Sequence, residues 1–156
     1  MNRICCFTGH RIIPNAEREE IKERLKSTLV SLIEKKGVTL FIAGGALGFD
    51  TMAALEVLSL RERYPEIKLR LAIPCENQTK GWKEKDILLY EEIMSQADDV
   101  VYTSRTYTSG CMHIRNRYMV DSSDFCVAYM TKESGGTAYT VKYAEKKGVE
   151  VINVAE

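Results

Sequence analysis

The chain has 156 residues with 22 lysines and arginines against 22 aspartates and glutamates, so its formal net charge at pH 7 is zero. This length suits one domain that buries roughly two-thirds of its unfolded surface. The balanced charge excludes a global field that would steer the protein toward DNA, RNA or an anionic membrane, so a nucleic-acid partner is disfavoured.

Six short runs rich in β-branched and aromatic residues have the pattern of strands. In chain order they cover residues 3–8, 39–43, 67–73, 99–102, 125–130 and 149–154. Amphipathic stretches lie between them. The first carries an apolar stripe and ends at Gly37, a suitable C-cap; the stripe consists of Ile21, Leu25, Leu29, Leu32 and Ile33. Further helices are predicted over residues 50–64, 83–97, 112–122 and 137–147.

Strand and helix therefore alternate along the whole chain. This order predicts an α/β fold of the Rossmann-like type, a mostly parallel sheet of about six strands with helices on both faces and right-handed crossovers. We expect residues 1–156 to form a single domain.

Cysteine usage and apolar runs bear on the compartment. The five cysteines are odd in number and show no CxxC spacing. The adjacent Cys5 and Cys6 would point to opposite faces of a strand. This pattern favours a reduced, cytoplasmic protein. We find no apolar run of about 18 residues and no leader of signal type, so we expect no membrane contact.

The two histidines, His10 and His113, have no cysteine or carboxylate around them at a zinc-ligand spacing. The chain also lacks a GxSxG nucleophile motif. We therefore expect no metal site and no cofactor, and we predict no catalytic residue from these patterns.

Three glycine-rich or unusual turns follow predicted strands: TGHR at 8–11, GGALGFD at 44–50 and ESGGT at 133–137. In an open α/β sheet, ligands bind beyond the carboxyl ends of the strands. Each turn opens toward a helix N-terminus, where unpaired N–H groups favour an anion such as phosphate. A Gly-Gly pair at such a turn more often serves only the tight bend. The glycines do not form the GxGxxG fingerprint, and no lysine completes a P-loop, so a standard NAD or ATP site is not supported.

Polar side chains near these turns are further candidates. Arg11 could clamp a phosphate or form a surface ion pair, and we weigh these two interpretations equally. Arg115 and Asn116 lie near the start of a predicted helix and could face a ligand. Trp82, the single tryptophan, could stack on a base or pack against the third helix.

Four stretches in order carry a resemblance to a known family: FTGHR at 7–11, AGGALGFD at 43–50, RNRYMVD at 115–121 and GGT at 135–137. Together they resemble the YpsA-like family of the SLOG superfamily over nearly the whole chain. The superfamily also holds the DprA-like DNA-processing proteins and the LOG cytokinin-activating enzymes. The resemblance implies a Rossmann-like fold and a nucleotide or nucleotide-derived ligand. Related members often self-associate, which leaves a homo-oligomer open.

LOG enzymes cleave the N-glycosidic bond of nucleoside monophosphates and carry a PGGxGTxxE motif with a catalytic glutamate. The corresponding stretch here is SGGTAYT, with Ser134 in place of the proline and Thr140 where the glutamate would fall. The resemblance therefore implies a phosphate-binding glycine platform without hydrolase activity. Another acid, Glu133 or Asp121, would have to replace the glutamate.

We therefore predict a sensor or binding module for a nucleotide-derived small molecule. The expected ligand-binding residues are Thr8, Gly9, Arg11, Gly44, Gly45, Asp50, Arg115, Asn116, Gly135, Gly136 and Thr137. The glycines would admit backbone contact, the threonines offer hydroxyls, the arginines neutralise phosphate, and Asn116 and Asp50 contact ribose or base edges.

Two other functions remain as alternatives. One is an N-glycosidic hydrolase or transferase acting on nucleotides, with a carboxylate that stabilises developing positive charge on the ribose. The other is a DprA-like binder of single-stranded nucleic acid, which would need a basic groove with stacking aromatic rings. The residues that could build such a groove are Tyr102, Arg105, Tyr107 and Arg117.

Overall fold

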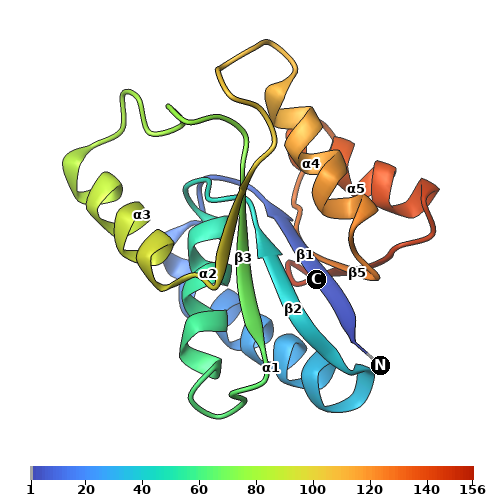
Figure 1. The fold of residues 1–156 in the computed structure, drawn as a ribbon. Coiled ribbons are helices and arrows are strands. Elements are labelled where there is room, and N and C mark those ends of the chain that lie inside the picture. Colours follow the sequence, from blue (N-terminus) through green and yellow to red (C-terminus); the bar gives the residue numbers. More distant parts are fainter. Residues whose placement is uncertain (1) are drawn as a thin grey trace.

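Alternating strands and helices build a six-stranded parallel sheet in residues 2–156, the part of the chain that the computed structural model describes (Figure 1). The strands are β1 (Arg3–Gly9), β2 (Val38–Ala43), β3 (Lys68–Ile73), β4 (Asp99–Tyr102), β5 (Phe125–Tyr129) and β6 (Glu150–Asn153). The helices are η1 (Asn15–Glu17, a 3-10 turn), α1 (Arg18–Lys36), α2 (Phe49–Leu60), α3 (Glu84–Gln96), α4 (Cys111–Asp121) and α5 (Gly136–Lys146). The predicted Rossmann-like class is confirmed.

The order of the strands across the sheet is β4-β3-β2-β1-β5-β6, and every neighbouring pair is parallel. From β1 the chain first steps outward to β4, and then it returns to place β5 on the other side of β1. Because each crossover is right-handed, this reversal puts the later helices on the opposite face. Helices α1 and α2 pack on one face, whereas α4 and α5 pack on the other (Figure 1).

The core consists of two apolar layers separated by the sheet. Cys5 and Phe41 belong to the larger layer, under α1 and α2. Cys6 and Ile42 belong to the smaller layer, where Met119 of α4 packs against them. The adjacent cysteines therefore point to opposite faces of β1, as their positions in one strand predict. All five cysteines of the chain are free and buried.

One predicted boundary is wrong by more than a residue. The second helix was expected to reach residue 64, but α2 ends at Leu60. The backbone N–H groups of Arg63 and Tyr64 both donate to the carbonyl of Leu60, at 3.1 and 2.9 Å, which closes a tighter turn. Pro65 follows and disfavours helical backbone at Tyr64, so the helical pattern stops short of it.

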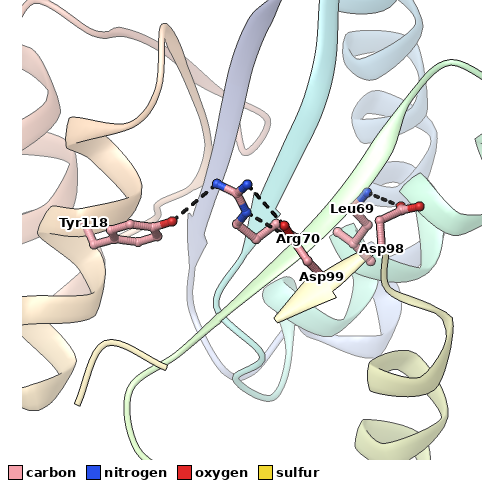
Figure 2. A network of polar contacts seen from close by, with 5 residues as sticks. All are labelled: Leu69, Arg70, Asp98, Asp99 and Tyr118. Atoms are coloured by element: carbon pink, nitrogen blue, oxygen red, sulfur yellow. Dashed lines mark hydrogen bonds and ion pairs between the residues drawn. The ribbon is translucent and has the colours of Figure 1, made fainter. Parts of the chain in front are cut away.

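Polar contacts hold the short edge strand β4, none of whose four residues is buried. Arg70 of β3 donates to both carboxylate oxygens of Asp99, at 2.9 and 3.2 Å, and to the hydroxyl of Tyr118, at 3.3 Å (Figure 2). Asp98 accepts a hydrogen bond from the backbone N–H of Leu69, at 2.8 Å (Figure 2). Arg70 therefore connects β4 to α4 across the amino-terminal half of β3.

Candidate functional site

A cleft of about 720 Å³ lies where the order of the strands reverses, at the carboxyl ends of β1 and β5. The starts of α2, α4 and α5 complete its walls. In open parallel sheets this reversal leaves a crevice, because the crossovers on its two sides lead to opposite faces. The cleft is thus the location that the topology favours for a ligand.

Nine of the eleven residues predicted from the sequence line this cleft. They are Thr8, Gly9, Arg11, Asp50, Arg115, Asn116, Gly135, Gly136 and Thr137. They come from four separate segments of the chain, which the fold brings together. Gly44 and Gly45 are not among the lining residues.

The two glycines of the second turn lie behind the cleft wall. A Cβ on Gly44 would lie 2.7 Å from Nη1 of Arg115 and 2.8 Å from Oδ2 of Asp50. Gly45 has a φ of 72°, in the left-handed region that glycine favours. Its carbonyl accepts a hydrogen bond of 3.2 Å from Nε2 of Gln78. Gly44 therefore leaves space for the side chains of Arg115 and Asp50, and Gly45 allows the turn after β2.

Asp50 is a buried carboxyl in the cleft wall, with 7% of its surface exposed. It is the second residue of α2, and the backbone N–H of Ala46 donates to its Oδ2 at 3.3 Å. Burial raises the pKa of Asp50 to about 6, while the charge of Arg115, the Ala46 N–H group and the charge of Arg11 act in the opposite direction. A carboxyl that titrates near neutral pH inside a cleft is typical of a functional site.

Arg115 reaches from α4 to the carboxyl ends of two strands. Its Nη1 donates to the carbonyl of Gly44 at 2.5 Å and to that of Ala72 at 3.4 Å. Its Nε donates to Oδ1 of Asn116 at 2.8 Å. Burial lowers the pKa of Arg115, and the charge of Asp50 opposes this shift. The guanidinium is therefore fixed in position by backbone and side-chain acceptors.

The N-terminus of α5 forms the opposite wall. Gly135 caps this helix with a φ of 95°, and Gly136 is its first residue. Apart from its chain neighbours and the backbone of α5 itself, no atom lies within 4 Å of a Cβ placed on either glycine. The first N–H groups of a helix have no intrahelical acceptor and carry the positive end of the helix dipole. Arg11 and Lys132 also line the cleft, so this wall suits an anion.

Backbone contacts join the loops that carry these residues. Gly48, with a φ of 81°, allows the loop after β1 to lie against the start of α2. A Cβ on this residue would lie 2.1 Å from the carbonyl oxygen of Arg11 in that loop. The N–H of Phe49 donates to the carbonyl of His10 at 3.1 Å. Nε2 of His10 accepts the N–H of Thr131 at 2.9 Å. The starts of α2 and of the loop after β5 are thus both held by the loop after β1.

Sequence reasoning missed several side chains of the cleft, among them the four residues His10, Met112, Lys132 and Ser134. His10 was considered only as a metal ligand, although it stands directly after β1. Its pKa is lowered, first by burial and then by the charge of Lys132, which suits the acceptor role of its ring. The signal that could have found all four is their position beyond a strand or at a helix start.

Other candidates lie outside the cleft. Asp121 and Glu133 are exposed and do not line it, and Asp121 accepts a hydrogen bond from Tyr143 instead. Trp82 packs edge-to-face on Tyr90 of α3, with ring centroids 5.5 Å apart. Within residues 2–156, no three metal-ligating side chains come together, and no helix is long and apolar enough to cross a membrane.

Together, the parallel sheet, the reversed strand order and the cleft at that reversal define a Rossmann-like protein with a crevice where open α/β sheets bind ligands. The family model YpsA, described as the YspA SLOG family, matches residues 8–153. The chain therefore belongs to the YspA SLOG family, and the resemblance to YpsA-like proteins is confirmed.

Two UPF0398 proteins of Bacillus species are similar in sequence to this chain. A UPF0398 protein of Bacillus thuringiensis strain Al Hakam is 36% identical over 133 residues, covering 83% of this chain and 72% of the relative. A UPF0398 protein of Bacillus cereus strain AH820 is 35% identical over the same length, with the same coverage.

Two solved structures share the fold. DNA processing protein A of Streptococcus pneumoniae superposes with a TM-score of 0.67 at 15% identity, covering 96% of this chain and 49% of that protein. DNA processing protein A of Helicobacter pylori, described for its binding of single-stranded DNA, gives a TM-score of 0.65 at 17% identity, covering 96% and 63%. This chain spans less than two-thirds of either protein, and at these identities the likeness concerns the fold.

Proposed function

We propose that residues 1–156 act as one domain that binds a nucleotide or nucleotide-derived ligand in the cleft, as a sensor or binding module. The phosphate groups lie against the N-terminus of α5, with Arg11 and Lys132 beside them. The hydroxyl groups of the ribose face the Asp50 side of the cleft. Membership of a SLOG family supports a ligand of this class.

One observation carries the proposal: the open glycine start of α5. Gly135 and Gly136 leave the first N–H groups of the helix accessible to the cleft, because neither has a side chain and no atom occupies the space beside them. The cationic side chains of Arg11 and Lys132 line the same cavity. Unpaired N–H groups, a helix dipole and positive charge together favour phosphate.

The test is thermal unfolding against nucleoside phosphates, ADP-ribose, dinucleotides and inorganic phosphate. A ligand at about 100 times its Kd adds about 2.7 kcal/mol, or roughly 5 to 10 °C in Tm for a domain of this size. Gly136→Val places a side chain in open space without a positive φ, so it should block the ligand and leave the unliganded Tm nearly unchanged.

The matched control is Gly110→Val. Gly110 also precedes a helix, has open space beside it and has a negative φ, but it does not line the cleft. We expect it to retain the ligand-induced shift. A shift that persists in Gly136→Val, or no shift for any ligand of the panel, would contradict the proposal.

The enzymatic alternative now depends on Asp50. It and Glu17 are the carboxylates that line the cleft among the described residues. Asp50 is buried and has a pKa of about 6. It is therefore a better candidate than the exposed Asp121 and Glu133 for the carboxylate of N-glycosidic hydrolysis or transfer. Release of free base from a nucleotide, lost in Asp50→Asn and kept in Glu133→Gln, would support an enzyme.

The nucleic-acid alternative has one favourable observation, two exposed aromatic rings. Tyr102 and Tyr107 are 47% and 64% exposed, at the end of β4 and in the loop that follows. Arg117 is engaged, because its Nη1 donates to the hydroxyl of Tyr139 at 2.9 Å. Failure to shift labelled single-stranded DNA at low salt would rule out this alternative.

A further inference from the structure

The guanidinium of Arg115 has little capacity left for a ligand. Only 5% of the residue is exposed. Its nitrogens already donate to the carbonyls of Gly44 and Ala72 and to the side chain of Asn116. The remaining nitrogen, Nη2, lies 3.8 Å from the sulfur of Met112. Nη2 is the one nitrogen without an oxygen acceptor, so a phosphate would have to displace the other contacts to be held by the forked guanidinium, and neutralising phosphate is a poor description of what this side chain does.

Arg115 and Asp50 lie close together on the two sides of one glycine. The Cβ that Gly44 lacks would come within 3 Å of both Nη1 of Arg115 and Oδ2 of Asp50. Among the groups that favour the charged form of Asp50, Arg115 comes first, ahead of the N–H of Ala46 and the charge of Arg11. The guanidinium therefore acts on Asp50 through space while it is held by the ends of β2 and β3.

We propose that Arg115 is a positioning residue: it joins α4 to the ends of β2 and β3 and keeps Asp50 ionised in the cleft. The ionised carboxylate then accepts hydrogen bonds from the hydroxyl groups of the ligand. This last step rests on the proposed function, whereas the effect of Arg115 on Asp50 does not. The site consequently distinguishes ligands that carry a free diol from those that carry phosphate alone.

The first experiment measures the ionisation of Asp50 directly, by NMR titration of its carboxyl carbon in the full chain. A positive charge nearby lowers the pKa of an aspartate by about one to three units, so Arg115→Met should raise it by about that amount. Arg115→Lys, which keeps the charge and loses the forked contacts, should raise it less. Arg11→Met is the comparison variant, because Arg11 affects the pKa of Asp50 less than Arg115 does. Its change in the pKa of Asp50 should be the smallest of the three.

A buried carbonyl left without its donor could prevent Arg115→Met from folding. Arg115→Gln keeps a donor at this position without the charge and takes its place in that case. An unchanged pKa of Asp50 in a folded variant without the charge would overturn the proposal.

The second experiment separates positioning from phosphate contact by comparing two probes, ADP-ribose, which carries diols, and inorganic pyrophosphate, which carries none. In Arg115→Met, a pKa of Asp50 about one unit above the pH would leave this carboxyl largely protonated at pH 7. The affinity for ADP-ribose should then fall about tenfold. Pyrophosphate affinity should stay within about twofold. In the Asp50→Asn background, Arg115→Met should have no further effect, because its route of action has been removed.

An equal loss of affinity for both probes in Arg115→Met would show that Arg115 contacts phosphate. Losses of affinity that add when Arg115→Met and Asp50→Asn are combined would show the same, and either result would refute the positioning role. If the wild-type chain binds neither probe and no other ligand of the thermal-unfolding panel, the proposed function fails. The titration of Asp50 then decides by itself whether Arg115 controls the ionisation of this carboxyl.

Discussion

Burial of Asp50 should make the stability of the protein depend on pH in a direction opposite to that of an ordinary paired carboxylate. The pKa of Asp50 is about 6 in the folded chain, against an ordinary value of 3.8. The folded state thus binds this proton more tightly than the unfolded state does. The stabilisation is fully present below about pH 4 and is lost as the pH rises through about 6.

The magnitude follows from the shift. One pKa unit corresponds to about 1.4 kcal/mol, so the shift of roughly two units removes about 3 kcal/mol of unfolding free energy between pH 4 and pH 7. Asp50→Asn resembles the protonated side chain and avoids this loss. We expect the variant to be as stable as the wild type near pH 4 and about 3 kcal/mol more stable at pH 7.5, or roughly 6 to 12 °C in Tm.

Urea denaturation of both proteins at half-unit steps from pH 4 to pH 8 measures the difference. The comparison at pH 4 is the internal control, because residue 50 is then neutral in the folded state of both proteins. A difference that does not change with pH, or an Asn variant that is less stable at pH 7.5, would refute the reasoning. If the variant is more stable and yet fails to bind ligand, the chain retains a destabilising carboxylate for its function.

Two further predictions concern close contacts around the cleft. Gly44→Ala should cost about 1 to 3 kcal/mol of unfolding free energy in urea denaturation, because the new methyl group meets Arg115 at 2.7 Å, whereas Gly110→Ala should change it by less than about 0.5 kcal/mol. Burial lowers the pKa of His10, and protonation of this ring at a pH below that pKa should remove the acceptor for the N–H of Thr131, because a charged imidazole has no lone pair to offer. Hydrogen exchange at Thr131 should therefore accelerate, after correction for the intrinsic rate, as the pH falls through the pKa of His10, and protection that does not change while NMR shows the His10 ring to be protonated would contradict this.

The sequence predicted the fold well because periodicity and turn residues act locally. Short β-rich runs alternate with amphipathic stretches, and Gly37 marks the end of α1 in the left-handed conformation that only a residue without a Cβ adopts readily. The prediction failed at the end of α2, where apolar periodicity continued to Tyr64 but the hydrogen bonds of the backbone closed a turn.

The sequence by itself also determined which segments form the cleft, because the carboxyl ends of parallel strands necessarily meet at one edge of the sheet. Only the tertiary structure decided what each residue does there. Gly44 and Gly45 lie behind the wall, since side chains distant in sequence occupy the space beside them. Arg115 is directed at the ends of β2 and β3, and Asp50 titrates near neutral pH because of burial. Burial and the distances between charges arise from packing of remote segments, and no local pattern encodes them.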